Sequence, residues 1–204
     1  MEKMDKSNFE LLARFNKYAN ESLNEIIKDL TEDQWNKQFS GYFKSIQEIC
    51  SHIYFWDYNC LNRFGYLRKF KCLNEKFKHM EKYSIKVSDE GNEYIDNDLT
   101  SSTNIFSGLT IEEYIEMRIN LDDRLISFVN EIEPNELEKV IKFTTIRGDK
   151  WEKRLDGFLI HLSHHQTHHR GMISIYLDLM GIKNEFNDLI YYVDKENIMR
   201  KIDY

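Results

Sequence analysis

The chain has 204 residues, enough for one domain with a sizeable core, and we expect a single domain over residues 1–204. Its net charge of -7 argues against a nucleic-acid partner, since binding to a phosphate backbone depends on clustered Lys and Arg. The first residues contain no apolar signal segment, and no run of about 18 apolar residues could span a membrane. We therefore expect a cytoplasmic protein that does not enter membranes.

Residues that interrupt helices are scarce, since the chain contains one proline, Pro134, and 8 glycines. Hydrophobic residues make up 41% of the chain, the composition of a packed protein. An all-β chain would need more turn residues, so we expect an all-α fold. The cysteines, Cys50, Cys60 and Cys72, are odd in number and fit reduced thiols in the core better than disulfides.

The first predicted helix begins at Ser7, where Ser7 and Glu10 have the spacing of a capping box. Apolar residues then recur every three or four positions until about Leu30. Thr31–Gln34 repeats the capping pattern and predicts a short helical turn.

The second predicted helix begins at Ser45, with Glu48 three residues further on, and runs to about Phe70. Periodicity then fades, and residues 71–109 are predicted to form a long, partly ordered loop. Connections of this length are uncommon in compact domains and are often functional lids, so this loop could cover a pocket.

The third predicted helix begins at Thr110, capped together with Glu113, and ends before Pro134. Alternating apolar residues between 137 and 154 predict a short strand or hairpin. The fourth helix is predicted from Trp151 to Met180.

Gly181 is the expected C-terminal cap of that fourth helix. The tail, residues 186–204, could pack as an extra segment.

Five of the 7 histidines fall between residues 161 and 169. Residues four apart project from the same face of a helix, so His161, His165 and His169 form one stripe beside apolar positions that the fold must bury. His164 and His168 lie about 100° round the helix and are predicted to be solvated.

Two histidines at positions i and i+4 can bind one metal ion, and a shared cation would offset the cost of burying several neutral imidazoles. His52, next to the apolar face of the second helix, is a candidate third ligand, because helical bundles build metal sites from facing helices. Three nitrogen ligands leave open positions, which is typical of a catalytic site. The expected cofactor is a divalent cation, zinc, nickel or iron, with copper equally compatible with imidazole.

Acidic residues near these histidines are candidates for supporting roles. Asp57, and Asp122 or Asp123, could orient a ligand imidazole or act as a base, but a solvated surface acid is the favoured interpretation. Arg170 adjoins His169 and could bind an anionic substrate; a salt bridge to a neighbouring helix is favoured.

Three tyrosines, Tyr54, Tyr58 and Tyr176, are candidates for lining a pocket, and the alternative is ordinary aromatic core. Gly171 is predicted to permit close helix packing, because a glycine inside a helix costs about 1 kcal/mol relative to alanine.

Several pieces of the sequence occur in an order known from one family: LARFNKYAN at 12–20, YFKSIQEICSH at 42–52, Gly148, HQTHHRGM at 165–172 and NDLI at 187–190. Through them the chain resembles the DinB-like superfamily of metalloproteins, the DinB and YfiT type. The resemblance implies an up-down-down-up four-helix bundle and frequent homodimers. It also implies a divalent-metal site of His52, His165 and His169, completed by water.

Members of that superfamily with known activity include thiol-dependent transferases and a mycothiol-dependent isomerase. The resemblance therefore implies a metal-dependent thiol S-transferase, or a hydrolase, acting on a small electrophile. Its expected partner is a small-molecule substrate such as a low-molecular-weight thiol. Two alternatives remain open: a noncatalytic metal-binding stress-response protein, and a helical interaction module whose histidines are incidental.

The chain departs from the family pattern at two places. His161 could be an additional ligand, a partner of a ligand or a pocket residue, and ligation is the least favoured of these. The predicted loop at 71–109 is larger than in a compact member.

Overall fold

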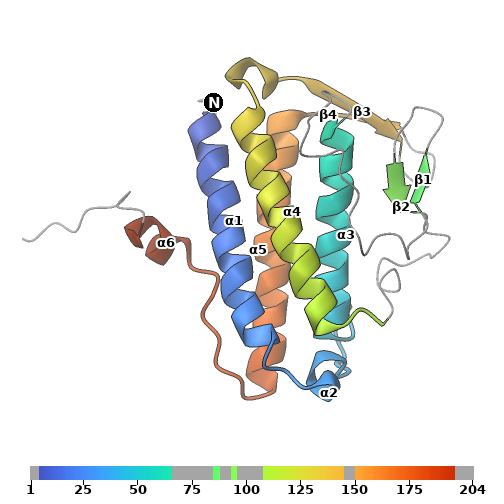
Figure 1. Ribbon diagram of the computed structural model, residues 1–204, viewed down its shortest axis with the longest axis vertical. Helices are drawn as coiled ribbons and strands as arrows, with labels where there is room; N and C mark the ends of the chain where they lie inside the picture. The colour runs from blue at the N-terminus through green and yellow to red at the C-terminus, as the bar shows by residue number, and fades with distance from the viewer. Residues whose placement is uncertain (1–4, 66–84, 88–92, 96–107, 145–149, 196–204) are drawn as a thin grey trace, which may run out of the picture.

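The computed structural model describes residues 5–65, 85–87, 93–95, 108–144 and 150–195 (Figure 1). Four long helices lie side by side: α1 (Lys6–Ile27), α3 (Ile46–Gly65), α4 (Ile111–Glu131) and α5 (Leu155–Leu179). Both α1 and α3 pack against α4 and α5. The mostly helical fold predicted from the sequence is confirmed. Within the described ranges no helix is both long and apolar enough to cross a membrane.

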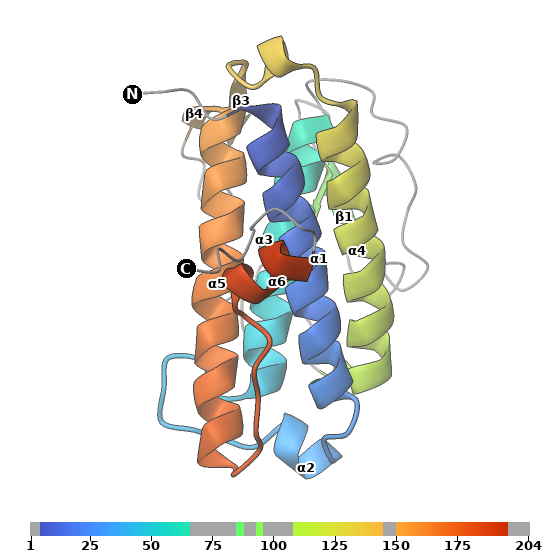
Figure 2. The ribbon, with the colours of Figure 1, turned by 90° about the vertical axis from the view of Figure 1, so that its left-hand side faces the viewer.

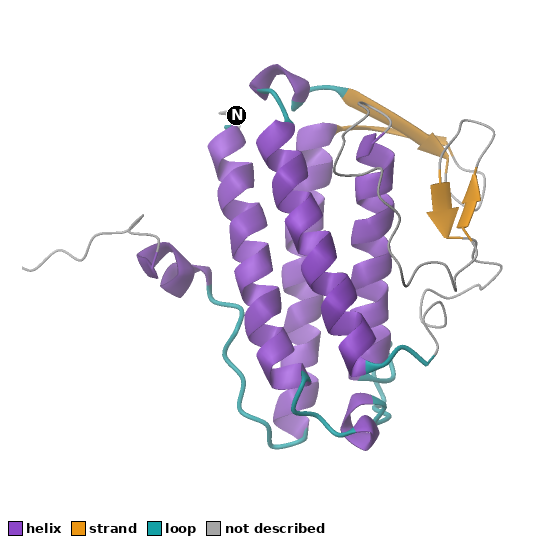
Figure 3. Cartoon of the chain, viewed as in Figure 1, coloured by secondary structure: helices purple, strands orange, loops and turns teal. Residues whose placement is uncertain are grey.

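The neighbouring helices α3 and α5 run in opposite chain directions (Figure 1). In the view of Figure 3, α1 and α5 run from top to bottom, whereas α3 and α4 run from bottom to top. Helix α2 (Glu32–Trp35) and the 3-10 helix η4 (Pro134–Glu136) lie in connections between them, and helix α6 (Leu189–Lys195) follows α5 in the tail.

Two pairs of short antiparallel strands accompany the helices. Strand β3 (Val140–Thr144) pairs with β4 (Lys150–Arg154), which confirms the predicted hairpin. The predicted helix start at Trp151 is wrong, because Trp151 pairs with Phe143 in this hairpin and α5 begins at Leu155. The predicted helix extended too far towards the N-terminus because Leu155, the first residue of α5, directly follows Arg154, the last residue of β4.

The predicted loop at 71–109 contains a strand pair that was not predicted. Strand β1 (Ile85–Val87) pairs with β2 (Glu93–Ile95), and three residues are too few for a periodic pattern to reveal a strand. Most of this loop lies outside the described residues. The prediction that the loop covers a pocket therefore also concerns residues outside the described ranges. The same holds for the predicted end of the second helix, at 66–70.

Side-chain caps fix three of the helix starts as the sequence indicated, including that of α3, where the hydroxyl of Ser45 accepts from the backbone N–H of Glu48. Thr31 with Gln34, and Thr110 with Glu113, form reciprocal capping boxes. The predicted cap at Ser7 is wrong, because α1 begins at Lys6 and Ser7 lies inside the helix, where its hydroxyl is not at the capping position. Gly181 follows α5 with φ +74, the left-handed conformation expected beyond a helix end.

The core fills the space between the four long helices, and the tail closes one side of it. Cys50 and Cys60 are buried free thiols, as predicted, whereas Cys72 lies outside the described residues. Tyr192 of α6 is buried against Phe15 on α1, and Figure 2 shows α6 lying over that helix. The expectation that the tail packs as an extra segment is confirmed for residues up to 195.

Candidate metal centre

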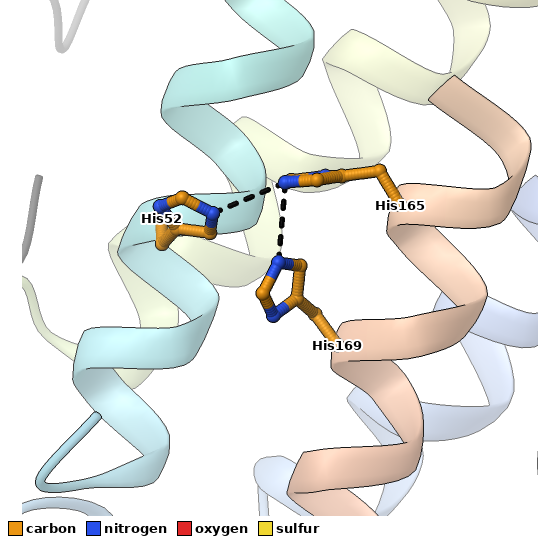
Figure 4. A group of neighbouring side chains, drawn as sticks. All are labelled: His52, His165 and His169. Carbon is orange, nitrogen blue, oxygen red and sulfur yellow. Dashed lines mark hydrogen bonds between the residues drawn. The ribbon is translucent and has the colours of Figure 1, made fainter. Parts of the chain in front are cut away.

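Three histidines from two facing helices converge on one point (Figure 4). The Nε2 atom of His165 lies 3.1 Å from Nε2 of His52 and 3.1 Å from Nε2 of His169. His52 comes from α3, and the other two lie four residues apart on α5, one turn of helix. The candidate ligand atoms of all three lie within 4.8 Å of one another. The sequence had singled out this same trio.

Hydrogen bonds alone do not account for the two contacts that Nε2 of His165 makes. A neutral imidazole has one N–H and one lone pair, so Nε2 of His165 cannot form good bonds in its ring plane with two Nε2 atoms at once. Two nitrogens bound roughly 2.0–2.1 Å from one ion lie about 2.8–3.4 Å apart at octahedral or tetrahedral angles, which brackets the observed 3.1 Å. The arrangement fits a shared divalent cation.

Burial keeps these imidazoles neutral, the form that can bind a metal. It lowers the pKa of His52 to about 4. Burial, with the neighbouring imidazoles, lowers the pKa of His165 to about 2 and that of His169 to about 3. All three are therefore uncharged at neutral pH, and no proton has to leave before a cation binds.

Aromatic rings hold the histidines from the sides. Phe43, three residues before the start of α3, lies 4.8 Å from the ring of His52 and 5.3 Å from the ring of His169. Trp56 lies 5.4 Å from the ring of His165. The buried Nδ1 atoms of His165 and His169 have no hydrogen-bond partner in the described part of the chain. Packing orients these two rings.

The remaining histidines of the run lie outside this trio. His164 and His168 are exposed, as predicted. His161 is exposed as well, with its ring 5.5 Å from Trp56 and 5.7 Å from His165. Burial lowers the pKa of His161, and so does the charge of Lys153. His161 thus lies beside the site but is not one of the three converging residues.

The interpretation of Asp57 and Asp122 as solvated acids is wrong, because both are 1% exposed. Asp57 accepts hydrogen bonds from Arg118 and Gln166, and Asp122 accepts from both Nε and Nη2 of Arg118. Asp123, one residue further on, is exposed and pairs with Lys17. The two buried acids belong to a polar network inside the helices.

Arg170 is also a buried structural residue, as favoured from the sequence. Its Nη1 donates to Oδ1 of Asn16 and of Asn20, and its Nε donates to Oδ1 of Asn187 in the tail. In place of the predicted salt bridge, Arg170 donates hydrogen bonds to these side-chain amides. Burial lowers the pKa of Arg170 to about 10, which still leaves it charged at neutral pH.

Sequence reasoning missed four members of this network: Arg118, Gln166, Asn16 and Asn20. A signal was present, because Arg118 and Asp122 lie four apart on the face of α4 that carries Met117, Leu121 and Leu125. Charged residues rarely lie on a buried face unless they are paired.

The outcomes differ among the tyrosine and glycine candidates. Tyr54 and Tyr58 are buried, with ring centroids 6.2 Å apart, and their role in lining a pocket remains a prediction. The hydroxyl of Tyr176 donates to the carbonyl of Phe43 over 2.6 Å and so supports the segment that contacts the histidines. The prediction for Gly171 is wrong, because a Cβ built there meets no neighbouring side chain within 4 Å among the described residues.

Comparisons with known proteins agree on one family. The sequence model of the DinB family matches residues 4–200. Protein DinB of Bacillus subtilis strain 168 is 23% identical over 184 residues, which is 89% of this chain and 91% of that protein. The crystal structure of a DinB-like protein, YjoA, from Bacillus subtilis superposes with a TM-score of 0.53 at 12% identity, covering 87% of this chain and 96% of that one. This likeness shows a shared fold.

Proposed function

This chain belongs to the DinB family, and on that premise we propose that His52, His165 and His169 bind one divalent metal ion in an open, catalytic site. The observation that carries the proposal is the convergence of three neutral Nε2 atoms from two helices. Three nitrogen ligands match the donor set of catalytic sites in which substrate or water takes the remaining positions. Zinc, nickel and iron are the candidate ions.

The proposed reaction is a thiol-dependent S-transfer to a small electrophile, with hydrolysis of such an electrophile as the second form. A bound divalent ion supplies a Lewis acid that favours the thiolate of a bound thiol, or the hydroxide of a bound water, near neutral pH. The chain contributes neutral imidazoles, held by burial, and the flanking rings of Phe43 and Trp56. The thiol route is preferred because characterised members of the superfamily that the chain resembles use it.

The scaffold proposed for this site is an up-down-down-up four-helix bundle formed by α1, α3, α4 and α5. We further propose that it works in the cytoplasm as a homodimer, an expectation that comes from the family resemblance.

Metal analysis of protein purified without chelators tests the binding step. We expect close to one divalent ion per chain, and loss of that ion in His165→Ala and His169→Ala. A protein that holds no metal after such purification and after reconstitution would contradict the proposal.

A panel of thiols tests the reaction step. Bacillithiol, mycothiol, glutathione and cysteine are each paired with small electrophiles, and His52→Ala is the control that should abolish turnover. No turnover with any pair of the panel in a metal-loaded protein would favour the second candidate, a noncatalytic metal-binding stress-response protein.

A further inference from the structure

Gln166 lies between the two histidines that α5 contributes to the site, but its side chain points into the buried network. Its Nε2 donates to Oδ2 of Asp57, and its Oε1 accepts from Nη1 of Arg170 over 3.2 Å. Gln166 is completely buried, with 0% exposure. Because one end of the amide meets a carboxylate and the other a guanidinium, only one orientation of the amide satisfies both partners.

The bond between Gln166 and Asp57 joins the two helices that supply the metal site. Asp57 lies on α3, five residues after His52, and Gln166 on α5 directly follows His165. A crossing hydrogen bond between buried groups fixes how far one helix can slide along the other. This link between α3 and α5 therefore lies one residue from His165.

Other members of the network also hold the carboxylate of Asp57 in place. Nη1 of Arg118 donates to the same Oδ2 atom over 2.8 Å, and its two other nitrogens, Nε and Nη2, donate to Asp122. Asn20 donates in turn to both oxygens of Asp122. The Asp57 carboxylate is thus anchored to α4, and through it to α1.

We propose that Gln166 and Asp57 are positioning residues that set the register of α3 against α5 and so bring His52 within metal-binding distance of His165 and His169. The inference rests on the proposed metal site. Ligand distances in such a site tolerate only about 0.2 Å, whereas helices joined by apolar contacts alone can shift further. The Nδ1 atoms of the two α5 histidines, which lack partners in the described ranges, cannot supply this register.

The test compares variants of the full chain by their affinity for Co(II) and by the visible spectrum of the bound ion. Gln166→Met keeps the length of the side chain but removes both hydrogen bonds. Asn20→Leu is the matched control, because it breaks the same network at α1, where Asn20 bonds Asp122 and Arg170, and removes neither hydrogen bond of Gln166. Asp57→Asn keeps a carbonyl that can accept from Gln166, whereas Asp57→Leu does not.

We expect Gln166→Met and Asp57→Leu to weaken Co(II) binding by roughly 10–100-fold and to change its spectrum, as losses of groups that support metal ligands do. Asn20→Leu should lower the Tm of the metal-free protein but leave affinity within about threefold, and Asp57→Asn should restore most of the affinity lost in Asp57→Leu. Wild-type affinity in Gln166→Met, or equal weakening by Asn20→Leu, overturns the inference alone. A wild-type protein that binds no Co(II) overturns the proposed site as well.

Discussion

The Nε2 atoms of His52 and His165 lie 3.1 Å apart although the two residues are separated by 113 positions in the chain. Both rings are partly buried, and both lie beside aromatic side chains. Bringing two lone-pair donors this close in a site of reduced solvation is unfavourable unless a proton or a cation lies between them. Because a neutral imidazole has a single N–H, one proton cannot serve both 3.1 Å contacts of His165 Nε2 in good geometry, so a shared cation is the better explanation.

Replacing one member of the trio should have an effect that its exposed neighbour does not share. His169→Ala removes one of three proposed ligands and should weaken divalent-metal affinity at least about 100-fold, whereas His168→Ala should leave it unchanged. Competition with a chromophoric chelator measures both constants. Equal affinities for the two variants would mean that the convergence of Nε2 atoms does not hold a metal.

The metal-free protein should lose stability as the pH falls. In the fold the pKa values of His52, His165 and His169 are about 4, about 2 and about 3, against about 6.5 in an unfolded chain. Above about pH 6.5 neither state binds these protons. Between about pH 6.5 and about pH 4 the unfolded chain takes up protons that the folded chain refuses, so the free energy of unfolding decreases with falling pH.

Urea denaturation at several pH values measures this slope, and His165→Gln is the comparison. Asp57 acts in the opposite direction, because burial raises its pKa to about 6 and its contribution to stability is lost as the pH rises through that value. The difference between wild type and His165→Gln cancels this term. If both proteins show the same slope below about pH 6.5, His165 is not kept neutral by the fold.

The buried ion pair should matter far more than a surface pair between neighbouring helices. Arg118→Leu leaves the carboxylates of Asp57 and Asp122 buried without their cation and should lower the free energy of unfolding by about 3–5 kcal/mol. Lys17→Met removes the pair with the exposed Asp123 and should cost at most about 1 kcal/mol. Denaturant titration of both variants decides the point, and a cost below about 1 kcal/mol for Arg118→Leu would contradict it.

Local spacing explains why so much of the fold and site was predictable. Capping pairs such as Thr110 with Glu113, and the pair His165 with His169, depend only on residues three or four apart. His52 was found because it lies beside the apolar face of its helix, which must turn towards the other helices. The DinB family match then confirmed the resemblance that these pieces suggested.

The polar network could not be predicted in the same way, because its partners come from four helices and the tail. Asp57 looked like a surface acid, since nothing near it in sequence offers a cation; its partner Arg118 is 61 positions away. Likewise, the boundary of α5 was misplaced because β4 adjoins it, and pairing with β3 is a nonlocal interaction.

The docking of α6 offers a matched pair of adjacent tyrosines. Tyr192 is buried, with its ring 5.8 Å from Phe15 and 5.1 Å from Tyr18, whereas Tyr191 is 62% exposed. Tyr192→Ala should therefore lower the free energy of unfolding by about 2–4 kcal/mol, and Tyr191→Ala should change it by less than about 0.5 kcal/mol. Equal effects in a denaturant titration would show that α6 does not dock on α1 in solution.

Two glycines should respond to alanine with opposite signs. At Gly171, inside α5, an added Cβ meets no neighbouring side chain within 4 Å in the described ranges, so Gly171→Ala should stabilise the protein by about 0.5–1 kcal/mol. At Gly41 the added Cβ would overlap the hydroxyl of Tyr176, which donates to the carbonyl of Phe43. Gly41→Ala should therefore lower the Tm and, because Phe43 packs against His52, also weaken metal binding. Calorimetry with and without metal separates the two effects, and a Gly41→Ala protein as stable as Gly171→Ala would refute the contact.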